Sequence, residues 1–260
     1  MTSFLARLGS GSLNTLQKTG EIWLLVVRTV GCLKRAYANR RLIILQMVEI
    51  GVDTVPMVAL MAVFTGMVLA VQTGYQALRF NLQGTVGPLV GLSITRELGP
   101  VLTGLIVAGR VGAAIAAEVG TMKVTEQIDA LETLATDPIE YLVMPRFLAA
   151  IVMLPILTVF ADAIGIAGGL LIAVTKLDLE GASYINATFT AMEVSDVIGG
   201  LIKATFFGMI IAIIGCYYGL TTTGGAEGVG KSTTGSVVLS LMLILVSDFF
   251  LTVLILSGRP

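Results

Sequence analysis

The stretch VDTVPMVALMAVFTGMVLAVQTG, residues 52–74, holds a single charged side chain, Asp53, close to its start. A helix needs about 20 mostly apolar residues to cross the hydrocarbon core of a bilayer. This stretch is long enough, and we predict that it forms a transmembrane helix. Four further segments satisfy the same criterion: residues 87–117, 147–175, 197–219 and 236–257.

The composition of the 260-residue chain is typical of a protein that is mostly embedded in a membrane. Hydrophobic residues make up 55% of the chain and charged residues only 13%, whereas soluble domains carry about 25% charged residues. We find no internal repeat and no linker in the sequence. We therefore expect an all-α integral membrane protein in which residues 52–260 form one transmembrane domain.

The composition also argues against several kinds of site. The chain has no histidine, which excludes Ser-His-Asp and Cys-His catalysis and removes the commonest metal ligand, so we expect no metal site. The net charge of −1 does not suggest a nucleic-acid partner. Cys32 and Cys216 both lie in apolar surroundings, and we interpret them as buried thiols rather than a redox pair.

The first 51 residues differ from the rest of the chain. Residues 13–36 combine an apolar core with five charged side chains. Arg28 would lie in the middle of a spanning helix, and Trp23 with its basic neighbours suits a helix at the membrane surface. We therefore predict an interfacial amphipathic helix rather than a sixth span, followed by a second amphipathic stretch at residues 40–51.

The distribution of Lys and Arg predicts the orientation in the membrane, because these residues concentrate on the cytoplasmic side. Ten of them, including Arg7, fall in residues 1–51 and in the connections 118–146 and 220–235, against three on the other side. The three are Arg79, Lys176 and Arg259. The N-terminus is thus expected in the cytoplasm and, after five spans, the C-terminus outside it.

Residues 225–232, GAEGVGKS, match the phosphate-binding pattern G-x-x-x-x-G-K-[ST]. A working P-loop joins a strand to a helix within an α/β domain. Here apolar spans precede and follow the string, and only 28 residues remain after Ser232. We interpret the string as a glycine-rich turn in which Ser232 or Thr233 caps the last helix. We expect no nucleotide binding and no enzymatic activity in this chain.

Charged residues inside spans are costly, and they usually face other protein or water. Arg96 and Glu97 open the stretch RELGP, in which Pro100 lacks an N–H donor and disfavours helical geometry at Gly99. We predict a broken helix there. The two charges either line a translocation cavity or form a structural ion pair inside the bundle, and the residues alone leave both readings open.

Two further membrane charges, Lys203 and Asp248, lie at similar heights in the last two spans, which are antiparallel neighbours. We predict that they pair, either as a structural contact or as part of a gate. The second span also carries small residues at every fourth position, a spacing that lets another helix approach closely within a subunit or between subunits. These small residues are Gly104, Ala108, Gly112 and Ala116.

An amphipathic helix is expected at residues 121–135, on the cytoplasmic side after the second span. Its apolar positions are Val124, Ile128, Leu131 and Leu134, and its polar positions are Glu126, Asp129 and Glu132. Asp137-Pro138 is expected to end it. The helix is either a docking element for a soluble partner or a surface helix packed on its own bundle.

Two stretches carry a resemblance to a known family. They are LSITRELGPVLTGLIVAGRVGAAIAAEVGTMKVTEQIDALETLATDPIEYLVMPR, residues 92–146, and GLTTTGGAEGVGKSTTGSVV, residues 219–238. The chain resembles the MlaE/YrbE-type permeases of MCE-associated ABC lipid transporters. The resemblance covers most of the chain and is weakest in the first 40 residues.

The resemblance implies a homodimeric permease in the bacterial inner membrane, with its N-terminus in the cytoplasm and its C-terminus in the periplasm. It implies a cytoplasmic ATPase subunit that binds ATP and Mg²⁺, a STAS-domain protein on that ATPase, and a hexameric MCE-domain protein on the periplasmic face. The cargo implied is phospholipid, moved between the inner membrane and periplasmic carriers, which supports outer-membrane lipid asymmetry.

The resemblance also assigns roles to residues of this chain. The helix around Glu126, Ile128, Asp129, Leu131 and Glu132 is similar to the coupling helix that seats in the ATPase. Arg96 and Glu97 fall in the helix that lines the lipid cavity of the family. The wall for the acyl chains is expected from the first span, at Met67, Leu69, Val71 and Tyr75.

The alternative function is an ion-coupled secondary transporter of a hydrophobic substrate that uses the membrane-embedded charges. The absence of repeat symmetry between the halves of the chain argues against it. The amphipathic helix at 121–135 also favours an external motor. Neither the lipid nor the direction of transport follows from the residues.

Overall fold

The computed structural model describes residues 2–37, 39–80 and 82–257, with the side chains of 2–12, 14 and 15 left undescribed. The side chain of Arg7, Arg259 and the C-terminal end, which entered the prediction of orientation, lie outside the described part. The described residues form helices and no strands, and five helical segments are long and apolar enough to cross a membrane. The prediction of an all-α integral membrane protein is confirmed.

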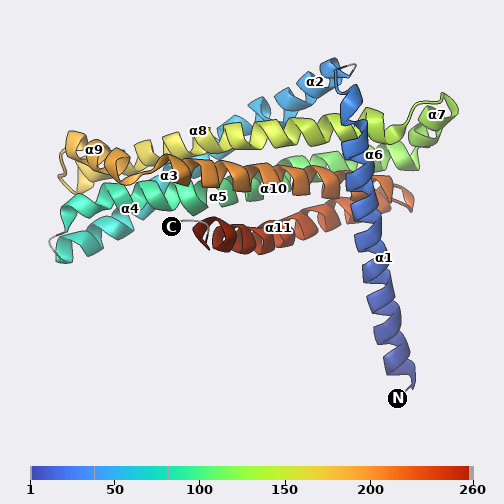
Figure 1. Cartoon of the computed structure of the whole chain (residues 1–260), viewed down its shortest axis with the longest axis horizontal. Coiled ribbons are helices and arrows are strands. Elements are labelled where there is room, and N and C mark those ends of the chain that lie inside the picture. Colours follow the sequence, from blue (N-terminus) through green and yellow to red (C-terminus); the bar gives the residue numbers. More distant parts are fainter. Residues whose placement is uncertain (1, 38, 81, 258–260) are drawn as a thin grey trace.

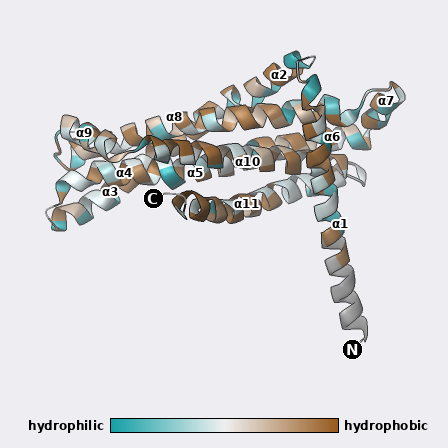
Figure 2. Ribbon diagram, in the orientation of Figure 1, coloured by the Kyte–Doolittle hydropathy of each residue, from teal (hydrophilic) through white to brown (hydrophobic). Residues whose placement is uncertain are grey.

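The five segments lie side by side along the long direction of the molecule (Figure 1). They are α3 (Val55–Arg79), the run α4–α6 (Val86–Val124), α8 (Met144–Lys176), α10 (Val194–Leu220) and α11 (Gly225–Ser257). Their surfaces are apolar over much of their length, most evenly on the C-terminal half of α11 (Figure 2). Exposed Met242, Phe249, Phe250 and Leu254 make up part of that α11 surface.

The second span is continuous rather than broken at Pro100, so the predicted break is wrong. It consists of α4 (Val86–Ser93), a π-helical turn η4 (Ile94–Leu98), α5 (Gly99–Val107), a second π-turn η5 (Ala108–Gly112) and α6 (Ala113–Val124). Pro100 stands in the first turn of α5, directly after η4. The N–H that Pro100 lacks therefore falls where the hydrogen bonds span five residues instead of four. Gly99 N, for example, donates to Ile94 O.

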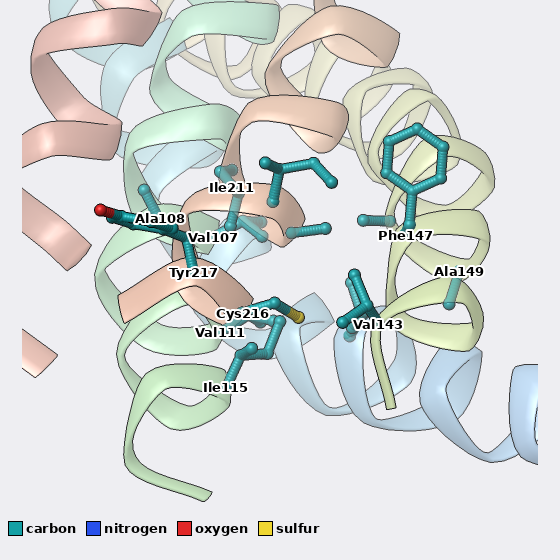
Figure 3. Packing of buried hydrophobic residues seen from close by; sticks show 14 of the residues in the cluster. Val107, Ala108, Val111, Ile115, Val143, Phe147, Ala149, Ile211, Cys216 and Tyr217 are labelled. Atoms are coloured by element: carbon teal, nitrogen blue, oxygen red, sulfur yellow. The ribbon is translucent and has the colours of Figure 1, made fainter. Parts of the chain in front are cut away.

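The packing of α3 on α8 explains the small residues of these two helices. Gly66 lies against the backbone of Gly165, where a Cβ on Gly66 would collide with the Gly165 carbonyl. The small residues of the second span lie against α10 of the same chain: Gly104 faces Phe207, Gly112 faces Ile211, and Ala108 and Ala116 are fully buried. Figure 3 shows part of the core formed here by α5–α6, α8 and α10.

Short helices occupy the two ends of the bundle (Figure 1). α7 (Gln127–Thr133) stands at one end, and α9 (Gly181–Ala191), which we did not predict, lies at the other. α2 (Arg40–Ile50) leads into α3 through a 3-10 turn, η2 (Val52–Thr54). Three further short turns are η1 (Leu33–Arg35), η3 (Gln83–Thr85) and the π-turn η6 (Ile139–Val143).

α1 (Thr2–Cys32) crosses the end of the bundle near α7 and extends away from it (Figure 1). Its C-terminal half packs on the bundle through buried Leu25 and Thr29, and Tyr217 donates a hydrogen bond to Glu21 Oε2 at 2.8 Å. The opposite side leaves Trp23 and Val27 exposed. α1 is not one of the five candidate spans among the described residues.

The Walker-like string is helical, which corrects two predictions. α11 begins at Gly225, well before the expected start at 236, and the connection from α10 is the short segment 221–224. Gly224 and Gly225 take positive φ angles of 87° and 65°, which glycine adopts without steric cost. Ser232 is therefore inside the helix, where its hydroxyl meets that of Thr222 at 2.8 Å, and it does not cap the helix.

Candidate functional site

A cavity of about 370 Å³ lies at the end of the bundle remote from α7. It is enclosed by the α4–η4 stretch, by the first turns of α10 and by the last turns of α11. The lining residues are Leu89, Leu92, Ser93, Arg96, Glu97, Asp196, Gly199, Gly200, Lys203, Thr252, Ile255 and Leu256. Aliphatic side chains thus surround a small group of charges.

Arg96 is held by Asp196 of α10. Its Nε and Nη2 donate to the two carboxylate oxygens of Asp196 at 2.8 and 3.1 Å, a bidentate geometry that fixes the guanidinium plane. The Asp196 side chain is fully buried, while 39% of the Arg96 side chain remains exposed. Asp196 also accepts a hydrogen bond from Glu193 N in the capping box of α10. The start of α10 therefore positions Arg96 at the cavity.

Glu97 is held by Lys203 of the same helix α10. Lys203 Nζ lies 2.6 Å from Glu97 Oε2 and 3.1 Å from Asp248 Oδ1, and it also donates to Arg96 O at 3.1 Å. The ion pair with Asp248 is thus longer than the ion pair with Glu97. Thr252 donates to the second Glu97 oxygen at 3.2 Å. One buried ammonium thus joins η4 to the last two spans.

The electrostatics of the site follow from this pairing. Arg96 and Glu97 are adjacent in the chain and both partly exposed, at 39% and 42% of their side chains. Their partners Asp196 and Lys203 are nearly inaccessible, at 0% and 3%. A substrate entering the cavity would therefore meet one cation and one anion. Each is paired with a buried residue of opposite charge.

The structure brings some predicted site residues together and leaves others apart. Lys203 and Asp248 meet, and Lys203 also brings Glu97 into the same group of charges. Arg96 and Glu97 do not form a pair with each other among the described contacts, because each has a partner on α10. The four α3 residues expected at the acyl-chain wall do not line this cavity; Met67, Leu69 and Val71 are half-buried and Tyr75 is exposed.

Asp196 and Thr252 belong to the site but were not predicted. Asp196 lies at the very start of a span, where acidic residues are common. The only signal in the sequence is its capping-box spacing, three residues after Glu193. Thr252 is a weakly polar residue in an apolar run. Both reach Arg96 or Glu97 only through contacts between residues more than 90 positions apart.

The expected amphipathic helix at 121–135 is shorter and is separated from the span before it. Residues 121–124 still belong to α6, and Glu126 adopts a left-handed φ of 60° before α7 begins at Gln127. Val124 therefore does not share the α7 face, and Leu134 is exposed. Ile128 is buried and Leu131 half-buried, while Glu126, Asp129 and Glu132 are exposed. α7 presents an acidic outer surface.

Known proteins are similar to this chain in sequence. The family model described as Permease MlaE matches residues 43–254. The chain belongs to the MlaE permease family. It is 54% identical to a probable ABC transporter permease protein of Rickettsia prowazekii (strain Madrid E) over 211 residues, 81% of this chain and 82% of the relative.

Two further relatives come from photosynthetic organisms. A probable ABC transporter permease protein of Synechocystis sp. (strain ATCC 27184 / PCC 6803 / Kazusa) is 45% identical over 240 residues, covering 92% of this chain and 89% of the relative. The chloroplastic protein TRIGALACTOSYLDIACYLGLYCEROL 1 of Arabidopsis thaliana is 38% identical over 213 residues, covering 82% and 61%. The chain is thus a multi-pass membrane permease of the ABC transporter type.

In this MlaE-family permease, residues 225–232 cannot form a P-loop as folded here. A P-loop cradles phosphate with free backbone N–H groups of a loop between a strand and a helix. Here the string forms the first two turns of α11, and the Lys231 ammonium pairs with Glu227 at 2.7 Å on the helix surface. Among the described residues, no three acidic or cysteine side chains are grouped so as to hold a metal ion.

Proposed function

We propose that this chain is the inner-membrane permease subunit of an ABC transporter that moves phospholipid between the inner membrane and a periplasmic MCE-domain carrier, and so maintains outer-membrane lipid asymmetry. The observation that carries the proposal is the cavity at one end of the bundle, with aliphatic walls and a paired cation and anion. Apolar walls suit acyl chains, and Arg96 and Glu97 suit the charges of a headgroup.

The two ends of the bundle carry different features, the cavity at one end and α7 at the other. The run α4–α6 is one uninterrupted rod of 39 residues, Val86–Val124, or about 58 Å at 1.5 Å per residue. The cavity lies near its start, and α7 follows its end. With the orientation predicted from the basic residues, the cavity is at the periplasmic side and α7 in the cytoplasm.

Each proposed partner has a surface that suits it. The cytoplasmic ATPase subunit, which binds the ATP and Mg²⁺ and carries the STAS-domain protein, would seat on α7. The hexameric MCE-domain protein would cover the end of the bundle that carries α9. The apolar surface of α11, which includes exposed Met242, Phe249 and Phe250, would face lipid or the second permease of a homodimer. The interfacial position of α1 is supported by its exposed Trp23 and Val27.

A lipid cargo receives support from one relative, which is named after a galactolipid, trigalactosyldiacylglycerol, and so after a molecule with the same two acyl chains as a phospholipid. An ion-coupled transporter is the alternative, since Glu97 and Asp248 are membrane carboxylates beside a cavity. The permease would be purified with its ATPase and carrier subunits and reconstituted with fluorescent phospholipid. We expect transfer that requires ATP hydrolysis; transfer driven by a proton gradient without any ATPase subunit would contradict the proposal.

The role of the cavity charges has its own test. Arg96→Ala and Glu97→Ala should each lower phospholipid transfer and cross-linking of a photoreactive phospholipid in the cavity, because each removes one of the two accessible charges. Arg79→Ala, an exposed arginine at the end of α3, is the matched control and should transfer normally. Wild-type transfer by both cavity variants would assign the charges to structure alone.

A further inference from the structure

Arg146 and Glu118 form an ion pair at the end of the bundle that carries α7, away from the residues that line the cavity. Arg146 Nη2 lies 2.7 Å from Glu118 Oε2, and Nη1 donates to Leu142 O at 2.8 Å. Only 4% of the Arg146 side chain is exposed, against 50% of Glu118. The Nε atom of Arg146 has no hydrogen-bond partner among the described residues, so Glu118 supplies the main compensation for this buried charge.

The pair joins the two helices that precede and follow α7 in the chain. Glu118 belongs to α6, the helix that enters the α7 segment, and Arg146 stands in the first turn of α8, the helix that leaves it. We call α6 and α8 the two stems of α7. Among the described residues, Glu118–Arg146 is the one ion pair that joins the two stems. The stems also pack together through α10, where Cys216 lies between Ile115 of α6 and Val143 of η6 (Figure 3).

α7 is linked to α6 by an ion pair and is flanked by two residues in the left-handed conformation. Lys123 at the end of α6 pairs with Asp129 of α7 at 2.8 Å. Glu126 and Ala135, on either side of α7, both adopt left-handed φ angles, 60° and 57°, which a non-glycine residue holds only when its surroundings impose them. Next to the departing stem, Glu140 of η6 accepts a hydrogen bond from Arg35 at 2.7 Å, which raises the pKa of Arg35.

The arriving stem reaches the cavity without interruption. Glu118 and Glu97 lie on the same rod, 21 residues apart, which corresponds to about 32 Å along an α-helix. The rod has two π-turns, η4 at the cavity and η5 between the cavity and α6. Single π-turns inside α-helices are frequent at functional sites. Because the helix continues without a gap from Glu97 to Glu118, a displacement of α6 can reach Arg96 and Glu97.

We propose that Glu118 and Arg146 are a positioning pair that couples α7 to the substrate cavity. By tying the two stems together, the pair makes them move as one body when α7 is displaced, so that the displacement reaches the cavity instead of being absorbed by separation of α6 from α8. The inference rests on the proposed function, in which an ATPase subunit displaces α7. Loss of the pair uncouples ATP hydrolysis from lipid transfer.

The test uses the complete reconstituted transporter and measures phospholipid molecules transferred per ATP hydrolysed, together with subunit assembly and melting temperature. Glu118→Gln with Arg146→Met removes both charges together, so that no buried charge is left without its partner. We expect this double variant to assemble and hydrolyse ATP, with transfer per ATP reduced at least fivefold. The exchanged pair, Glu118→Arg with Arg146→Glu, should recover more than half of the wild-type ratio.

The control is the exposed pair of α11, neutralised as Glu227→Gln with Lys231→Gln, which should keep the wild-type ratio. An assembled neutral double variant with wild-type transfer per ATP would overturn the proposal. So would an exchanged pair that assembles but stays uncoupled, and so would failure of both variants to assemble, because the pair would then serve folding alone. Failure of the proposed function is distinguishable, since the wild-type transporter itself would show no ATP-dependent transfer.

Discussion

Lys203 gives the sharpest quantitative prediction, because one buried ammonium satisfies three groups from two other segments. Lys203→Met keeps the length of the side chain and removes the charge. Glu97 and Asp248 then lose their common partner, and the Arg96 carbonyl loses a donor. The two carboxylates then repel each other without a cation between them, so the last turns of α11 should separate from η4.

The size of the effect follows from the burial of the partners. Removing one member of a buried pair costs about 3–5 kcal/mol. Glu97 keeps 42% of its side chain exposed and Asp248 19%, so water compensates part of the loss and we expect about 3 kcal/mol, at the low end of that range. For a domain of this size, about 2–4 °C per kcal/mol converts this into a fall in melting temperature of about 6–12 °C.

The assay is thermal unfolding of the purified permease in one detergent, followed by tryptophan fluorescence or by loss of the monodisperse peak. Lys176→Met, the same change at an exposed position ending α8, is the matched control and should melt with the wild type. Asp248→Asn should lower the melting temperature less than Lys203→Met, because Lys203 retains Glu97 and the Arg96 carbonyl. The reasoning fails if Lys203→Met melts within 2 °C of wild type, or if Asp248→Asn is the more damaging change.

Four other substitutions test three separate parts of the structure. Gly66→Val should destabilise the permease by about 1–3 kcal/mol, since its side chain would meet the Gly165 backbone; an unchanged melting temperature would contradict the close α3–α8 contact. Lys231→Ala should leave nucleotide binding by the assembled transporter intact, as measured with a fluorescent ATP analogue, because Lys231 only pairs with Glu227. Leu131→Asp should reduce co-purification of the ATPase subunit, as should Glu126→Lys, and retention by both variants would remove α7 from the docking surface.

Much of the membrane architecture could be predicted because it depends on local composition. Five apolar segments became five candidate spans, and the matching heights of Lys203 and Asp248 anticipated that they would meet. The partners of Arg96 and Glu97 could not be predicted in the same way. Those contacts join residues about 100 positions apart, and only the packing of α10 on η4 brings them together.

The errors of detail have physical reasons as well. Pro100 indicated a break, but the π-turn before it removed the need for its N–H, and the helix continues. The glycines of residues 225–230 indicated a turn, but two positive φ angles at Gly224 and Gly225 were enough to reverse the chain. The left-handed conformation of Glu126 separated α7 from α6, and no residue type at that position signals it.

The π-turn at Ala108–Gly112 has a consequence for how this chain tolerates insertions and deletions. An α-helix rotates by about 100° per residue, so deleting one residue from an α-helical part between Glu97 and Glu118 would turn its two halves to face new directions, and either Glu97 would leave Lys203 or Glu118 would leave Arg146. Both contacts would survive only if the π-turn, which holds one extra residue, changed to α-helical hydrogen bonding. Alignments of related permeases should therefore place gaps outside this rod, in the connections at its two ends, and a one-residue gap inside it would signal a different hydrogen-bond pattern rather than a lost residue.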